Sequence, residues 1–137
     1  MKAMLNNEKV YDFLASFFVL FGAYIDKCEI NINEVRGDII CKDDENEKQN
    51  FIWIITLEEY VLNNLKLLCD FLLKYNFVHG DTIIISEKRL ELKLSELGWN
   101  VSDAKENIDK LCSIEVKMID NGEEIDSFFL TSIEHNL

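Results

Sequence analysis

Side chains that could carry out catalysis are few in this chain and lie far apart. The two histidines, His79 and His135, stand in different parts of the sequence, and neither is spaced from a serine or cysteine as a general base would be. The run His79-Gly80-Asp81 would place a carboxylate beside an imidazole, but it is more typical of a solvated turn. Adjacent acids such as Glu58 and Glu59 point in different directions on a helix or strand, so they form no acid–base pair. The sequence therefore predicts no catalytic residues and no enzyme.

Metal and cofactor sites are not indicated either. The four cysteines have none of the close pairings that zinc sites use. They are Cys28, Cys41, Cys69 and Cys112. The acidic run at 43–47 lacks the spacing of a calcium-binding loop, and no glycine-rich phosphate-binding motif occurs. We expect no metal, no cofactor and four free thiols, which favours a reducing compartment and a cytoplasmic protein.

Net charge is the unusual feature of the composition. The chain has 26 acidic and 14 basic residues, which leave a formal net charge of −12 at pH 7. Such a field repels nucleic acid and anionic membrane and favours a cationic protein partner. The acids concentrate in two clusters, which we predict to be partner-binding. They are Asp43, Asp44, Glu45 and Glu47 in the first cluster, and Asp120, Glu123, Glu124 and Asp126 in the second. Charged loops also keep proteins soluble, so an interface and a solvated surface both remain open at this point.

The N-terminal part predicts one helix and a meander. The 137 residues suit one domain, and apolar residues recur at helical spacing over residues 7–25, with Asn6 or Asn7 available as a cap. The apolar segment Val10–Ile25 is shorter than the ~20 residues that span a bilayer and contains Asp12, so we expect a buried helix. Period-two patterns then predict three antiparallel strands at 28–33, 38–42 and 51–55. A turn around Arg36-Gly37-Asp38 and an acidic loop over 43–50 would connect them.

The middle of the chain predicts a long helix and a short strand. Thr56 and Glu59 have the spacing of a capping box, in which each side chain bonds the other residue's backbone N–H. A helix is therefore expected from Leu57 to Tyr75. Its leucines occur on several sides, which predicts burial between two layers. The apolar run Thr82–Ile85 predicts the strand.

The last third predicts two short helices and a hairpin. Ser86 is placed to cap a helix over 87–97 that ends at Gly98, and Ser102 to cap a second helix over 103–112. The step Asn121-Gly122 favours a type I′ turn between strands at 114–119 and 125–130. In this order, residues 57–132 resemble the winged helix-turn-helix family. The resemblance implies a DNA-reading second helix and a hairpin that serves as the wing.

Charge departs from the DNA-binding pattern of that family. The helix over 103–112 has one more acid than base, and Asn107 is its only side-chain amide able to read a base edge. Beyond Lys117 the hairpin has no basic residue to meet a phosphate. We therefore expect no nucleic-acid binding, and the resemblance implies a scaffold for protein contacts.

Taken together, the patterns predict an α+β fold in a single domain, 1–137. Residues 1–56 would form a helix on a three-stranded antiparallel meander, and 57–137 a winged-helix-like half. We expect a small acidic protein-binding module of the immunity-protein kind, which inhibits a basic partner such as a nuclease toxin. The alternative is an acidic winged-helix adaptor in a transcription or chromosome-maintenance complex. The run Phe128–Leu130 also offers an edge strand through which two copies could form a homodimer.

Overall fold

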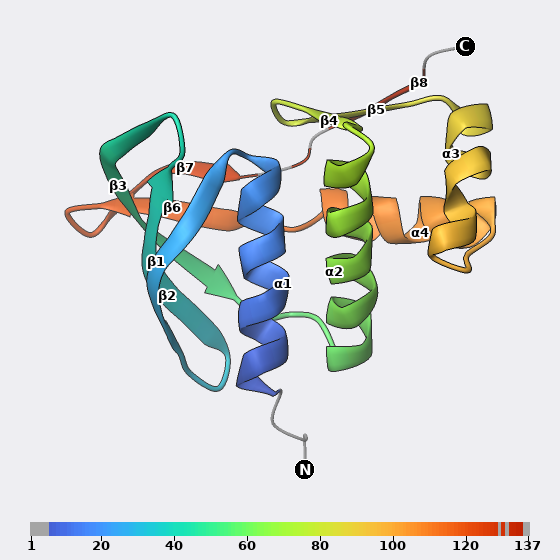
Figure 1. Cartoon of the computed structure of the whole chain (residues 1–137). Coiled ribbons are helices and arrows are strands. Elements are labelled where there is room, and N and C mark those ends of the chain that lie inside the picture. Colours follow the sequence, from blue (N-terminus) through green and yellow to red (C-terminus); the bar gives the residue numbers. More distant parts are fainter. Residues whose placement is uncertain (1–5, 129, 131, 136–137) are drawn as a thin grey trace.

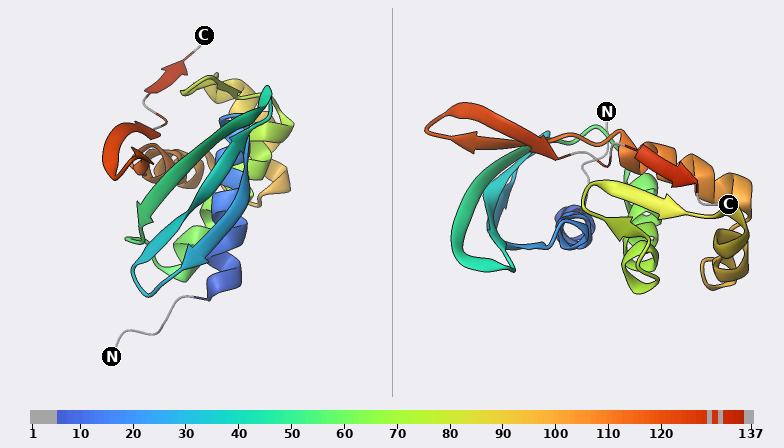
Figure 2. Two further views of the ribbon diagram at one scale, coloured as in Figure 1. Left: turned by 90° about the vertical axis from the view of Figure 1, so that its left-hand side faces the viewer. Right: turned by 90° about the horizontal axis from the view of Figure 1, so that it is seen from above.

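Four layers of secondary structure follow one another across the molecule. The computed structural model describes residues 6–128, 130 and 132–135. A curved five-stranded sheet packs on the first helix, and the remaining helices follow in succession on the side away from the sheet (Figures 1 and 2). The buried apolar residues form one continuous core. The predicted α+β class is confirmed.

Helix α1, Asn7–Leu20, is the layer on which the sheet packs. The Asn6 side chain caps it by accepting a hydrogen bond from the Glu8 N–H at 2.9 Å, as predicted. Its buried stripe is aromatic and packs against β3, with the rings of Phe18 and Phe51 4.8 Å apart. The expected extension to residue 25 is wrong, because Gly22 has φ +70° and turns the chain into the first strand. No helix in the described ranges is long and apolar enough to cross a bilayer.

The meander consists of β1, Ala23–Ile30, β2, Glu34–Cys41, and β3, Asp44–Ile54. The predicted turn at residues 36–38 is wrong, because these residues lie in the middle of β2, where Gly37 pairs with Cys28 and Phe51. The predicted acidic loop over 43–50 is also wrong, because β3 begins at Asp44 and only Lys42 and Asp43 form the turn. Backbone pairing between long strands here overrides the side chains that normally favour turns.

A C-terminal hairpin completes this sheet. It consists of β6, Val116–Asp120, and β7, Glu123–Phe128, and it gives the strand order β1-β2-β3-β6-β7. Asn121 and Gly122 have φ of +52° and +80°, which confirms the predicted two-residue turn. The hairpin joins the N-terminal meander through pairing of β6 with β3. Residues from both ends of the chain therefore share one sheet.

Helix α2, Glu59–Lys74, packs between α1 and helix α4, Val101–Cys112. The predicted capping box does not form, since Glu58 is the N-cap residue and makes no side-chain capping bond. The Ile55 N–H donates to the Asn33 carbonyl at 3.0 Å, and the helix begins only at Glu59, after Glu58 in extended conformation. Burial between two layers is confirmed for most of the helix, although Leu67 is 48% exposed.

A second sheet and a helix pair form the other end of the molecule. The sheet has the order β4-β5-β8, from Val78–His79, Thr82–Ile85 and Ser132–His135. Helix α3, Glu87–Lys93, continues into the 3-10 turn η1, Leu94–Glu96. The predicted Ser86 cap and the left-handed Gly98, φ +66°, are confirmed. The cap of α4 is Asn100 and not Ser102, because the Asn100 side chain accepts from the Asp103 N–H at 2.8 Å.

The arrangement bears on the winged-helix resemblance, which stays a prediction. The expected helix, strand, helix pair and hairpin all occur in the expected order. The hairpin, however, extends the five-stranded sheet, while strand β5 pairs with β4 and β8 in the other sheet.

Gly37 should tolerate no side chain. A Cβ there would overlap the Lys27 carbonyl oxygen and lie 2.9 Å from the Cys28 Cα, so the β1 backbone would have to move. We expect Gly37→Ala to lower the free energy of unfolding by about 2 kcal/mol, measured by urea denaturation. Gly80→Asn is the control, because a Cβ at Gly80 meets nothing within 4 Å and asparagine tolerates its φ of +64°. Equal stability of the Gly37→Ala variant and the wild type would contradict the close approach of β1 and β2.

Candidate functional site

The first acidic cluster lies at the tip of the β2–β3 hairpin, residues 42–48, which we call the β2–β3 tip. Asp43 is in the turn, and Asp44, Glu45 and Glu47 are on the first residues of β3. All four side chains are exposed. The Asp44 carboxylate accepts a hydrogen bond from the Asn46 N–H at 3.1 Å, which fixes one carboxylate at the start of the strand.

The second cluster lies at the tip of the β6–β7 hairpin, residues 120–125, which we call the β6–β7 tip. Asp120, Glu123 and Glu124 are exposed beside the turn. Glu124 has a lysine partner, since Lys117 Nζ lies 3.7 Å from its Oε2. Asp126 is on β7, where its backbone pairs with Met118, but its side chain lies outside the described residues.

Pairing of β3 with β6 places the two tips along one side of the sheet. The register Asn50↔Ile119 puts the β6–β7 turn beside the residues of β3 that precede Asn50. Both hairpins therefore project from the same end of the molecule, at the left in Figure 1. The structure therefore places most of the predicted partner-binding residues at this end of the molecule, on two hairpin tips that lie apart when viewed from that end (Figure 2).

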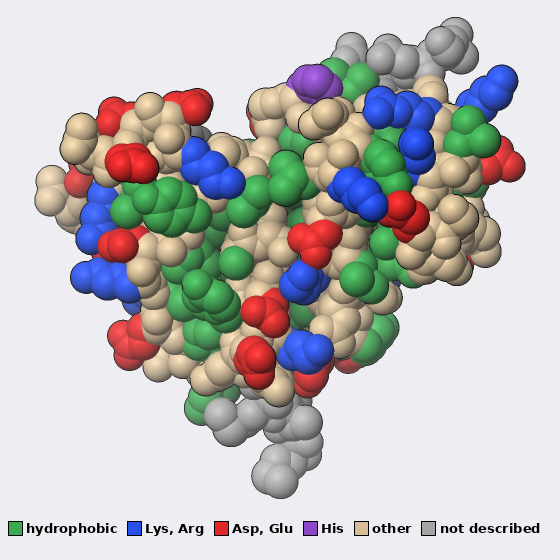
Figure 3. Space-filling view, viewed as in Figure 1, with side chains coloured by type: hydrophobic (Ala, Val, Ile, Leu, Met, Phe, Trp, Pro, Cys, Tyr) green, Lys and Arg blue, Asp and Glu red, His purple; other side chains and the backbone are tan. Residues whose placement is uncertain are grey.

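Several carboxylates of the two tips have no basic partner. Among the described residues, no ion pair is formed by Asp43, Asp44, Glu45, Glu47, Asp120 or Glu123. Many of the lysines pair with acids elsewhere, such as Lys66 with Asp70 at 2.7 Å on α2. In the part of the chain that the structure describes, acids without an ion pair also occur on helices, for example Asp109. The tips differ from the rest of the surface because several such acids lie close together in the sequence. Lysines are interspersed at this end as well (Figure 3).

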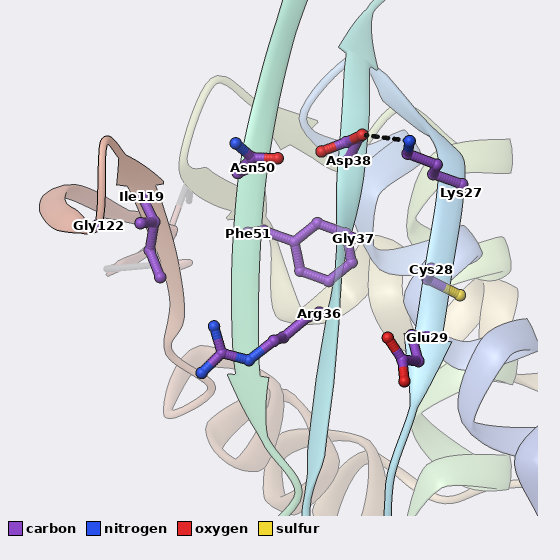
Figure 4. Close-up of a pocket in the computed structure, with 10 residues that line it drawn as sticks. All are labelled: Lys27, Cys28, Glu29, Arg36, Gly37, Asp38, Asn50, Phe51, Ile119 and Gly122. Carbon is purple, nitrogen blue, oxygen red and sulfur yellow. Dashed lines mark ion pairs between the residues drawn. The ribbon is translucent and has the colours of Figure 1, made fainter.

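A shallow hollow of about 570 Å³ separates the β6–β7 tip from strands β1–β3 (Figure 4). Its most buried charged group is Asp38, which is 8% exposed. Lys27 and Lys48 lie 3.7 and 3.5 Å from this carboxylate, and Lys48 also reaches Asp26 at 2.9 Å. The two lysines therefore offset the charge of Asp38, whereas most carboxylates of the tips form no ion pair with a described residue.

The cluster of Asp38 and its lysines is not predicted by the sequence pattern. The sequence predicts Asp38 at the junction of a turn and a strand over 38–42, whereas it lies in the middle of β2, beside Ile39, on a strand whose alternate residues enter the core. The lysines come from β1 and β3, which pair with β2 on either side. Alternation over residues 35–39 was the available signal, but the cross-strand partners depend on register and cannot be obtained from spacing.

The thiols show no activation for chemistry. Cys28, Cys41, Cys69 and Cys112 are all free, and burial raises the pKa of each thiol, that of Cys112 to about 11. A thiol with a raised pKa has little thiolate at neutral pH and is a poor nucleophile. His79 is exposed on β4 beside the turn at Gly80 and Asp81, as predicted, while the side chain of His135 lies outside the described residues. No group of three or more metal-ligating side chains occurs in the described part of the chain.

The pKa of the Cys41 thiol is raised in part by the negative charge of the β2–β3 tip. Its pKa is raised first by burial and then by Glu47, which accepts a hydrogen bond from the thiol, with smaller contributions from Asp44 and Asp43. For Cys28, burial alone raises the pKa. The carboxylates of the β2–β3 tip thus act together on a group next to them.

No protein-family model, curated protein or solved structure matches this chain.

We expect Glu47→Gln to accelerate alkylation of Cys41 severalfold. Removing the carboxylate lowers the pKa of the thiol, so more thiolate is present at about pH 8, where the thiolate is the reacting form. The rate with iodoacetamide can be followed by mass spectrometry of the Cys41 peptide. Cys28 in the same sample is the internal reference, and its rate should not change. Parallel acceleration of both thiols would indicate loosened structure, and no change at Cys41 would contradict the electrostatic effect.

Proposed function

We propose that this protein is a small acidic binding module of the immunity-protein kind, which inhibits a basic partner such as a nuclease toxin. The observation that supports this most directly is the placement of six exposed carboxylates, none in an ion pair with another described residue, on two hairpin tips at one end of the molecule. They are Asp43, Asp44, Glu45, Glu47, Asp120 and Glu123. A cationic surface that approaches this end would meet all of them.

The mechanism is electrostatic attraction followed by occlusion. A nuclease holds the phosphates of its substrate in a cationic cleft, and the tips offer carboxylates in place of phosphates. Such charges raise the rate of encounter with an oppositely charged surface, and the effect is strongest at low salt. Lys27 and Lys48 beside the hollow do not oppose the approach, because they already pair with Asp38. The partner is therefore held by contact, and no reaction is required.

The structure supports narrow protruding contacts better than a broad flat one. The β6–β7 tip stands away from strands β1–β3, with the hollow between them (Figures 1 and 4). A projecting tip can enter a cleft that a flat surface could only cover. This shape suits an enzyme with a substrate groove more than a partner with a convex surface.

The proposal predicts that binding depends on where charge is removed. A tip variant carries Asp43→Asn, Asp44→Asn, Glu45→Gln, Asp120→Asn and Glu123→Gln. A control variant removes five exposed charges elsewhere, by Glu8→Gln, Glu58→Gln, Asp81→Asn, Glu91→Gln and Asp109→Asn. Both have the same net charge, so only the position of the charge differs. Immobilised wild type should capture a small basic protein from the lysate of its host, the control should retain most of it, and the tip variant should lose it.

The captured protein then allows a kinetic measurement. Stopped-flow association should be at least about tenfold slower for the tip variant, and the wild-type rate should fall steeply with salt. If the partner degrades nucleic acid, an equimolar amount of the wild-type protein should stop that degradation. Equal losses in the tip and control variants would show that net charge alone matters and would contradict the proposal. Capture of transcription or chromosome-maintenance subunits, unaffected by the tip variant, would favour the adaptor alternative.

A further inference from the structure

Helix α3 carries a cationic face that stands out in a protein of net charge −12. The face surrounds Leu92. Lys88 and Arg89 lie four and three residues before Leu92, and Lys93 lies four residues after Arg89, so all of them share one side of the helix. Leu92 is 71% exposed. Within the described residues none of these three cations forms an ion pair with a carboxylate. Basic side chains gather at this end in the space-filling view (Figure 3).

Aromatic rings hold two of these cations in place. The Arg89 guanidinium lies 4.6 Å from the centre of the Phe77 ring and donates a hydrogen bond to the Tyr75 carbonyl at 2.8 Å. The Lys93 ammonium lies 4.8 Å from the centre of the Tyr75 ring. Cation–π contacts restrict the side chains without neutralising their charge. The α3 face, defined as Lys88, Arg89, Leu92 and Lys93, is therefore an ordered basic surface around an exposed apolar residue.

The β6–β7 tip has the opposite chemistry in a similar pattern. Ile125 is 55% exposed and directly follows Glu123 and Glu124. It is the extra residue of a bulge, because Ile119 pairs with Glu124 and Met118 pairs with Asp126. An exposed isoleucine next to carboxylates complements an exposed leucine among cations.

We propose that the β6–β7 tip of one copy binds the α3 face of a second copy. Ile125 would pack against Leu92, and Asp120 and Glu123 would face Lys88 and Lys93. The two surfaces lie at opposite ends of the molecule (Figure 1), so one copy cannot join its own tip to its own α3. Two different surfaces that meet in this way give a head-to-tail contact, which extends into chains or closes into rings. This inference does not depend on the basic partner proposed above.

The net charge sets the conditions under which this contact forms. Two copies of charge −12 repel each other at long range, which weakens association at low salt. At about 150 mM salt the screening length is ~8 Å, so distant like charges are screened while charges in contact still attract. The interaction should therefore be weak, dependent on protein concentration and observable at physiological salt.

Charge exchange between the two surfaces tests the proposal. Sedimentation velocity of the wild type from about 10 µM to about 1 mM at ~150 mM salt should show oligomers that grow with concentration. Lys88→Glu with Lys93→Glu, and separately Asp120→Lys with Glu123→Lys, should each weaken self-association about fivefold or more. A one-to-one mixture of the two variants should regain association, detected with a fluorescent label on one of them. The reversed tip attracts the reversed α3 face, and the wild-type tip of one variant attracts the wild-type α3 face of the other.

Controls separate this contact from general effects. Lys9→Glu and Asp109→Lys change charge at exposed positions away from both surfaces and should leave association unchanged. Ile125→Ser should weaken it without altering the net charge. Circular dichroism and melting temperature establish that each variant is folded. A wild type that stays monomeric up to about 1 mM, association that persists in both reversed pairs, or folded variants whose mixture fails to associate would each overturn the proposal.

Discussion

Pairing between β3 and β6 is the constraint on which the rest of the structure depends. Three residue pairs, Asn50↔Ile119, Phe51↔Met118 and Ile52↔Lys117, join segments from the two ends of the chain. This pairing lets Met118 extend the core that Phe51 and α1 begin, so burial of apolar surface favours the same register as the hydrogen bonds. Without it, the meander and the hairpin would be separate elements and the two acidic tips would have no fixed relation.

The distribution of lysines determines where the negative charge can act. A protein with 26 acids and 14 bases must leave carboxylates unpaired, and folding decides which ones. Burial of Asp38 requires cations nearby, because an unpaired buried carboxylate is costly, and Lys27 and Lys48 supply them from the neighbouring strands. These lysines lie close to the tips but are engaged with Asp38. The stability of the sheet and the charge of the tips are therefore linked through the same side chains.

Local signals in the sequence predicted several local features, although the capping box at Thr56 and the cap at Ser102 were wrong, and they predicted long-range structure poorly. Asn6 and Ser86 cap helices, and Asn121-Gly122 forms a turn, because each depends on backbone groups within a few residues. Gly37 was misread because glycine favours turns, whereas here it allows β1 to pass close to β2. The two acidic clusters were identifiable from composition. Their placement at one end of the molecule was not, because it arises from the pairing of β3 with β6, which are separated in the chain by three helices and two short strands.

The acidic tips and the basic α3 face lie at opposite ends of the molecule, and the β6–β7 tip would serve in both proposed contacts. A basic partner and the α3 face of a second copy compete for the β6–β7 tip, so each lowers the apparent affinity of the other by mass action. A strongly cationic partner binds the tip more favourably, because it is attracted to a protein of net charge −12, whereas two copies of the protein repel each other. Partner binding should therefore dissociate the self-assembled form and leave α3 exposed. The net negative charge that weakens self-association thus also favours replacement of the second copy by a cationic partner.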